Sequence, residues 1–131
     1  MKSNLDSMFK TDKALERDGV LFMISETVGF RVRRFNSDNP NIRAARAHHL
    51  KPYARLIENE SLPLEKEREI YVKVFVAACL VGWKGVEIDG KEAEYSPEAA
   101  VKLLTELPDL FETLVAQASD SKNYREEVGN S

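Results

Sequence analysis

Several residue types that carry function elsewhere are scarce in this chain of 131 residues. A single cysteine, Cys79, excludes a disulfide within one molecule. The longest apolar stretch, residues 70–82, is interrupted by Lys73 and is shorter than the roughly 20 residues that a membrane helix needs. No apolar run of a secretory signal occurs near the start. We therefore expect a cytoplasmic protein with no membrane partner and a core that is stable without cross-links.

Groups that carry catalysis or hold a cofactor are also missing. The phosphate-binding patterns GxGxxG and GxxxxGK[ST] are absent, and no serine lies in a nucleophile-elbow sequence. The two histidines, His48 and His49, are adjacent, so on a helix they point about 100° apart and cannot grip one metal together. Cys79 lies in an apolar run, where a free cysteine is usually a small buried hydrophobic residue. The sequence predicts a non-enzymatic binding protein with no cofactor and no metal.

What is present fits one domain. Hydrophobic residues make up 43% of the chain and charged residues 31%, which is enough for one core under a well-solvated surface. The formal net charge of -3 argues against a dedicated nucleic-acid binder. We expect a single domain over residues 1–131, with flexible ends at about 1–12 and 121–131, because both ends are polar.

Two pairs of short apolar runs predict β-hairpins. Residues 20–24 and 30–35 are rich in β-branched and aromatic side chains and are joined by polar residues ending in Gly29. Residues 86–88 and 91–95 flank Asp89-Gly90, a dipeptide that tolerates the positive φ angles of a tight hairpin turn. The sequence therefore predicts an N-terminal β-hairpin and a short central hairpin near the Asp89-Gly90 turn.

The remaining segments predict helices. Asn39-Pro40 starts a helix that Pro52 bends or divides. A second helix begins at Pro63, is apolar on nearly every side beyond Ile70, and ends at Gly82 as its C-cap. Ser96-Pro97 and Pro108 start two more. The predicted fold class is α+β, a helix-dominated single domain. The expected inner faces contain Ile42, Ala45, Tyr53, Leu56 and Ile57 in the first helix, and Val101, Leu104, Leu107, Leu110, Phe111, Leu114 and Val115 in the last two.

Charge is unevenly distributed along the chain. Residues 31–55 hold seven basic side chains and one acidic side chain, whereas residues 85–131 hold eleven acidic and four basic side chains. The two halves can neutralise each other within one fold. They can instead meet between copies, in a head-to-tail contact that builds rings or filaments. The arginines can also contact nucleic-acid phosphates.

Charge and aromaticity select the candidate protein-binding residues. Trp83, the one tryptophan, lies where the apolar helix ends, so it either caps the core or anchors an interface. The complete set of candidates is Arg31, Arg33, Arg34, Arg43, Arg46, Trp83, Phe111 and Tyr124.

An ordered series of short motifs resembles the tail assembly chaperones of long-tailed phages, the siphophages. It contains a Trp-x-Gly turn, an Asp-Gly hairpin, an aromatic-Ser-x-Glu-x-Ala helix start, a Leu-Pro break and a late aromatic. The opening segment, with Phe9-Lys10-Thr11-Asp12, Gly19-Val20 and Asn39-Pro40, is similar as well. In this chain the later motifs are Trp83-Lys84-Gly85, Asp89-Gly90, Tyr95-Ser96-Pro97-Glu98-Ala99-Ala100, Leu107-Pro108 and Tyr124.

The resemblance implies a specific function. Such chaperones bind the tape measure protein in the host cytoplasm, recruit tail tube subunits, act as oligomers and are absent from the finished virion. In many phages a frameshift appends a second domain to some copies. Two other classes remain open: a nucleic-acid-binding regulator that uses the basic residues 31–55, and a structural phage tail or connector component.

Overall fold

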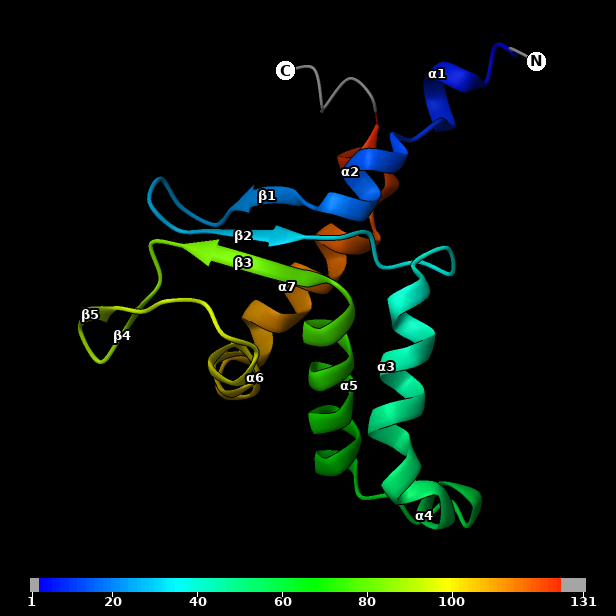
Figure 1. The fold of residues 1–131 in the computed structure, drawn as a ribbon, viewed down its shortest axis with the longest axis vertical. Coiled ribbons are helices and arrows are strands. Elements are labelled where there is room, and N and C mark those ends of the chain that lie inside the picture. Colours follow the sequence, from blue (N-terminus) through cyan, green and yellow to red (C-terminus); the bar gives the residue numbers. More distant parts are fainter. Residues whose placement is uncertain (1–2, 126–131) are drawn as a thin grey trace.

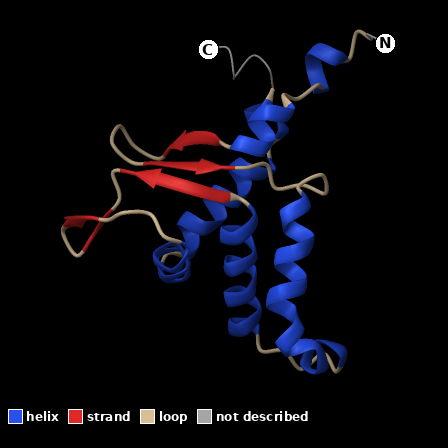
Figure 2. Cartoon of the chain, in the orientation of Figure 1, coloured by secondary structure: helices blue, strands red, loops and turns tan. Residues whose placement is uncertain are grey.

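A computed structural model describes residues 3–125 of the chain, in which helices lie below and behind a three-stranded antiparallel sheet and a second, two-stranded sheet projects from the body (Figures 1 and 2). The predicted α+β class, dominated by helices, is confirmed. The elements in chain order are α1 (Asp6–Phe9), α2 (Lys13–Asp18), β1 (Val20–Met23), β2 (Gly29–Val32), α3 (Pro40–Leu50), η1 (Lys51–Tyr53), α4 (Ala54–Glu58), α5 (Leu64–Ala78), β3 (Leu80–Lys84), β4 (Glu87–Ile88), β5 (Lys91–Glu92), α6 (Pro97–Glu106), α7 (Pro108–Ser119) and η2 (Ser121–Tyr124).

The N-terminal hairpin is confirmed, and it forms part of a larger sheet. Strands β1 and β2 pair antiparallel, with Phe22 opposite Phe30, and β3 joins the other side of β2 in the order β1-β2-β3. Phe30 and Val32 are buried on one face of this sheet, whereas Arg31 between them is exposed on the other. Helix α7 passes behind the sheet and covers the buried face (Figure 1).

Strand β3 corrects the predicted helix end. The sequence predicts a helix that continues to Gly82, but α5 stops at Ala78 and the next residues pair with β2, placing Trp83 opposite Phe30. An unbroken apolar run has the same appearance in a buried helix and a buried strand, so periodicity cannot locate the change. Pairing with β2 decides it, because this satisfies the backbone groups of both segments.

Helices α3 and α5 pack side by side and, with η1 and α4 at their lower end, form a helical arm below the sheet (Figure 1). The predicted division at Pro52 is confirmed, since η1 interrupts the helix there. The Asn39 side chain caps α3 by accepting a hydrogen bond from the Asn41 amide at 2.9 Å, and its own amide donates to the Ala78 carbonyl at 3.1 Å. One side chain therefore ties the start of α3 to the end of α5.

The core forms where α5 meets the sheet, α6 and α7. Phe75, Ala78 and Cys79 are completely buried there. The Phe75 ring meets that of Phe111 edge-on at 5.5 Å between centroids, an arrangement that aromatic rings favour. Three predicted inner positions are wrong: Leu56 and Ile57 on α4 and Leu107 at the α6–α7 junction are all exposed.

The central hairpin is confirmed at Asp89-Gly90, where both residues have positive φ, 53° and 77°. The predicted start of α6 is confirmed too, because the Ser96 hydroxyl oxygen accepts a hydrogen bond from the Ala99 amide at 3.1 Å. The indole of Trp83 donates to the carbonyl of Ala93, which lies between the turn and α6, at 2.8 Å. This bond fixes the base of the hairpin.

The C-terminal segment packs against the sheet and the N-terminal region as far as Arg125. Tyr124 is completely buried, and its hydroxyl donates to the Val32 carbonyl in β2 at 3.1 Å. The Asp12 amide donates to the Tyr124 carbonyl at 2.7 Å, and Thr11 pairs with Arg125 in a β-bridge. Because residues 121–131 are mostly polar, their sequence does not predict that residues 124–125 pack against residues 11–12. Of the ends that the sequence predicts to be flexible, residues 1–2 and 126–131 lie outside the described residues.

Candidate protein-interaction surfaces

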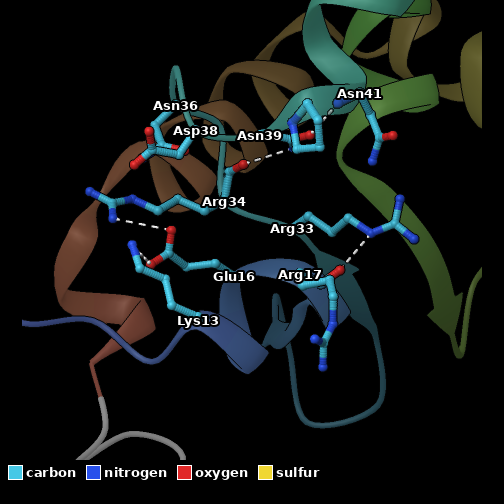
Figure 3. A pocket seen from close by; sticks show the side chains of 10 residues that line it. Lys13, Glu16, Arg17, Arg33, Arg34, Asn36, Asp38, Asn39 and Asn41 are labelled. Atoms are coloured by element: carbon cyan, nitrogen blue, oxygen red, sulfur yellow. Dashed lines mark hydrogen bonds and ion pairs between the residues drawn. The ribbon is translucent and has the colours of Figure 1, made fainter.

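A hollow of about 210 Å³ gathers basic side chains between α2 and the start of α3 (Figure 3). It includes two of the predicted candidates, Arg33 and Arg34, which follow β2 directly. The side chains that line it belong to Lys13, Glu16, Arg17, Arg33, Arg34, Asn36, Asp38, Asn39, Pro40 and Asn41.

The basic groups in the hollow are already engaged by the fold. The Glu16 carboxylate lies 3.4 Å from the Lys13 ammonium and 3.4 Å from the Arg34 guanidinium, and it accepts a hydrogen bond from the Thr11 hydroxyl. Arg33 donates through Nε to the Arg17 carbonyl at 2.8 Å. These contacts attach α2 to the segment after β2, so we assign Arg33 and Arg34 to the packing of the N-terminal region.

The Glu16 cluster predicts a pH-dependent contribution to stability. Burial alone raises the pKa of Glu16, but the Thr11 hydrogen bond and the charges of Lys13 and Arg34 outweigh it, so the pKa lies below its usual 4.5. The stabilisation is therefore complete above about pH 5 and is lost as the pH falls through the lowered folded-state value. In urea titrations, we expect Glu16→Gln to be less stable than wild type by about 1 kcal/mol at pH 7.

That difference should shrink steadily as the pH is lowered from 5 to 3, because wild type then protonates Glu16 itself. Glu106→Gln removes an exposed carboxylate that has no ion pair within residues 3–125 and is the matched control. A stability gap that stays constant with pH would assign Glu16 a packing role without charge.

Four basic side chains on α3, η1 and α4 form no ion pair with a carboxylate within residues 3–125. Arg43 and Arg46 are exposed on α3 and lie three positions apart, so they project from the same side of the helix. Two further exposed basic residues, Lys51 in η1 and Arg55 in α4, lie toward the lower end of the arm. We call these four residues the basic flank. Within residues 3–125, none of the five ion pairs includes a residue of this flank.

The acidic side chains of the C-terminal half lie elsewhere on the molecule. Residues 87–94 form a hairpin that projects to the left of the body, away from α3 on the right (Figure 1). We call this segment, with exposed Glu87, Asp89, Glu92 and Glu94, the acidic hairpin. In the described part of the chain, no ion pair joins its carboxylates to a basic group. Within residues 3–125, therefore, no ion pair with the basic residues 31–55 neutralises the acidic hairpin.

The other predicted candidates occupy different environments. Arg31 is exposed on the open face of the sheet and donates to the Gly19 carbonyl at 3.0 Å. Trp83 is half-buried and meets Phe30 and Tyr95 edge-on, which favours the core-capping alternative over the interface anchor. Phe111 and Tyr124 are core residues in this fold, so neither is accessible to a partner.

Two exposed apolar groups were not selected from the sequence. Leu5, Met8 and Phe9 around α1 are 50%, 52% and 65% exposed, and their i, i+3, i+4 spacing puts them on one side of that short helix. We call them the N-terminal patch. The arm-tip patch consists of Leu56 and Ile57 on α4 and Leu64, 65% exposed, at the start of α5. The two patches lie at opposite ends of the long axis (Figure 1).

The cysteine and the two histidines are the remaining candidates for a reactive or metal-binding site. Cys79 is completely buried, and burial raises the pKa of its thiol to about 12, which disfavours the nucleophilic thiolate. Burial also lowers the pKa of His49, which is packed edge-on against His48. In residues 3–125 no three His, Cys, Asp or Glu side chains are grouped as metal ligands. No helix in that range is long and apolar enough to cross a bilayer.

The fold and its surfaces define an α+β protein with segregated charge and exposed apolar ends. The chain belongs to the YdaY prophage protein family, whose model matches residues 37–130, more than half of the sequence. The phage origin implied by the resemblance is thereby supported, whereas the family description does not specify a tail role. Neither the curated proteins nor the solved structures compared with the chain match it.

Proposed function

We propose that the chain is a tail assembly chaperone, a non-catalytic protein of the host cytoplasm that binds the tape measure protein and recruits tail tube subunits. Its phage family and the ordered motif series from Trp83 to Tyr124 support this proposal. The observation that carries it is the pair of apolar patches at the two ends of the molecule.

A holdase needs apolar surface that its own fold leaves uncovered. A tape measure protein is a long helical chain, and helices bind partners through rows of apolar side chains. The N-terminal patch and the arm-tip patch each present three large apolar side chains. Binding through such patches stabilises the soluble form of the client by mass action and needs no reactive centre.

Co-expression with a tape measure protein from the same prophage tests this function. We expect wild type to keep the client soluble in a complex that co-purifies. Replacing the arm-tip patch by Leu56→Ser, Ile57→Ser and Leu64→Ser, or replacing all three residues of the N-terminal patch by serine, should weaken the complex at least about tenfold. Truncating an interface anchor commonly costs more than 1 kcal/mol, and about 1.4 kcal/mol corresponds to tenfold.

Glu58→Ser combined with Glu65→Ser is the matched control, because both are exposed polar neighbours of the arm-tip patch. This variant should bind like wild type. If wild type neither solubilises the tape measure protein nor co-purifies with it, the chaperone proposal is wrong. Stoichiometric presence of the chain in purified virions would instead identify a structural tail component.

A nucleic-acid-binding regulator is the second candidate, favoured by the basic flank, which forms no ion pair within residues 3–125. Binding of that kind weakens steeply with salt, because phosphate contacts release counterions. A DNA mobility-shift assay at low salt separates the two functions, since absence of any shift would eliminate the regulator.

A further inference from the structure

We propose that copies of this chain associate head to tail, with the acidic hairpin of one copy docked on the basic flank of the next. The inference concerns the purified chain alone and does not depend on the chaperone function. It rests on the placement of charge within the described residues.

The acidic hairpin holds an unfavourable charge pair. Glu87 in β4 lies directly opposite Glu92 in β5, and like charges in that position destabilise a hairpin. Asp89 in the turn adds a third carboxylate, and Lys91, the one basic residue of the segment, is paired with Ile88. A cationic partner from outside the hairpin relieves this repulsion.

The hairpin is also exposed to an unusual extent. Every residue of β4 and β5 is exposed, including Ile88, and an isolated two-stranded hairpin is only marginally stable in water. Its base is fixed by the Trp83 indole and by the Ala93 amide, which donates to the Val86 carbonyl at 2.9 Å. The acidic hairpin, with the exposed side chain of Ile88, therefore projects away from the body.

The complementary surface is available on the same chain, but on the opposite flank. Arg43 and Arg46 are exposed, form no ion pair within residues 3–125, and project from the same side of α3. Because α3 and the hairpin are on opposite sides of the body, the hairpin of one molecule cannot reach its own basic flank (Figure 1). A contact between two different surfaces is heterologous, so repeating it builds a ring or an open filament.

A charge-swap experiment tests this contact. One variant carries Glu87→Lys and Glu92→Lys, and the other carries Arg43→Glu and Arg46→Glu; all four positions are exposed. The molar mass of wild type should rise with concentration at low salt and fall toward the monomer at high salt, because salt screens the contact. Each variant alone should associate at least about tenfold more weakly, since its two docking surfaces then repel.

Mixing the two variants should restore association. The lysine hairpin of the first variant fits the glutamate flank of the second, and the original surfaces provide the reverse contact. The control variant carries Glu106→Lys on α6 and Glu112→Lys on α7, which change the net charge by as much as the two hairpin substitutions do. It should associate like wild type. Circular dichroism monitors folding, and restored association in the mixture itself requires both variants to be folded.

Three outcomes would overturn the proposal: wild type that stays monomeric at low salt up to its solubility limit, a hairpin variant that associates like wild type, or a mixture of folded variants that remains monomeric. Tape measure binding is measured separately, so a monomeric chain that still holds its client would refute this inference and leave the chaperone function intact.

Discussion

Tyr124→Ala is expected to lower the free energy of unfolding by about 3–5 kcal/mol, the range for removing a fully buried aromatic side chain. Tyr124 is among the largest completely buried side chains in the described structure, although it stands close to the polar end of the chain. Its removal leaves a cavity between η2 and β2 and takes away the hydrogen bond to the Val32 carbonyl. Urea denaturation followed by tryptophan fluorescence measures the loss, because Trp83 lies in β3 of the same sheet.

Tyr124→Phe separates the ring from its hydroxyl. It keeps the packing and removes one hydrogen bond to Val32, so it should cost only about 1 kcal/mol. A Tyr124→Ala variant that is as stable as Tyr124→Phe would show that the C-terminal segment is detached from the sheet in solution. The expected order of stability is therefore wild type, Tyr124→Phe and Tyr124→Ala, with the larger step between the two variants.

Local turn and capping chemistry made much of the fold predictable. The Asp89-Gly90 turn, the Ser96 cap and the break at Pro52 each follow from the backbone geometry that those residues prefer, and the structure has all three. Such signals act over a few residues, so a single sequence contains the whole cause. They located the hairpins and the starts of α3, α6 and α7.

Long-range pairing accounts for what was missed. Residues 80–82 are strand because β2, some fifty positions earlier in the chain, offers them backbone partners. Tyr124 is core because it reaches the Val32 carbonyl, 92 positions away. In both cases the deciding partner is distant in sequence, and local pattern holds no information about it. Leu107 is a different case: it follows the last residue of α6 with non-helical backbone angles, φ −122° and ψ 76°, so it leaves the inner stripe and is exposed.

The candidate surfaces were predictable in charge but not in apolar contacts. Segregation of basic and acidic residues is visible in the sequence, yet only the fold separates Arg34, which is paired with Glu16, from Arg43 and Arg46, which stay unpaired in the described residues. The candidates Phe111 and Tyr124 were selected because they are aromatic, and both are buried in the core. Phe9 and Leu64 are instead exposed because no element within residues 3–125 covers them.

Gly85→Ala is expected to lower the free energy of unfolding by more than about 2 kcal/mol, because two strains combine at this position. Gly85 has φ +71°, a conformation that disfavours a side chain, and an added Cβ would lie only 1.9 Å from the carbonyl oxygen of Thr27 in the β1–β2 loop. Since that neighbour is backbone, the two loops must separate to make room.

Gly90 and Gly82 divide this effect into its parts. Gly90 also has positive φ, +77°, but an added Cβ meets nothing within 4 Å, so Gly90→Ala should cost only about 1 kcal/mol from backbone strain. Gly82 lies in β3 without positive φ and with open space around it, so Gly82→Ala should stay within about 0.5 kcal/mol of wild type. Equal losses for Gly85→Ala and Gly90→Ala in urea titrations would mean that the β1–β2 loop yields freely, and that the close approach of Thr27 to Gly85 does not hold the two loops together.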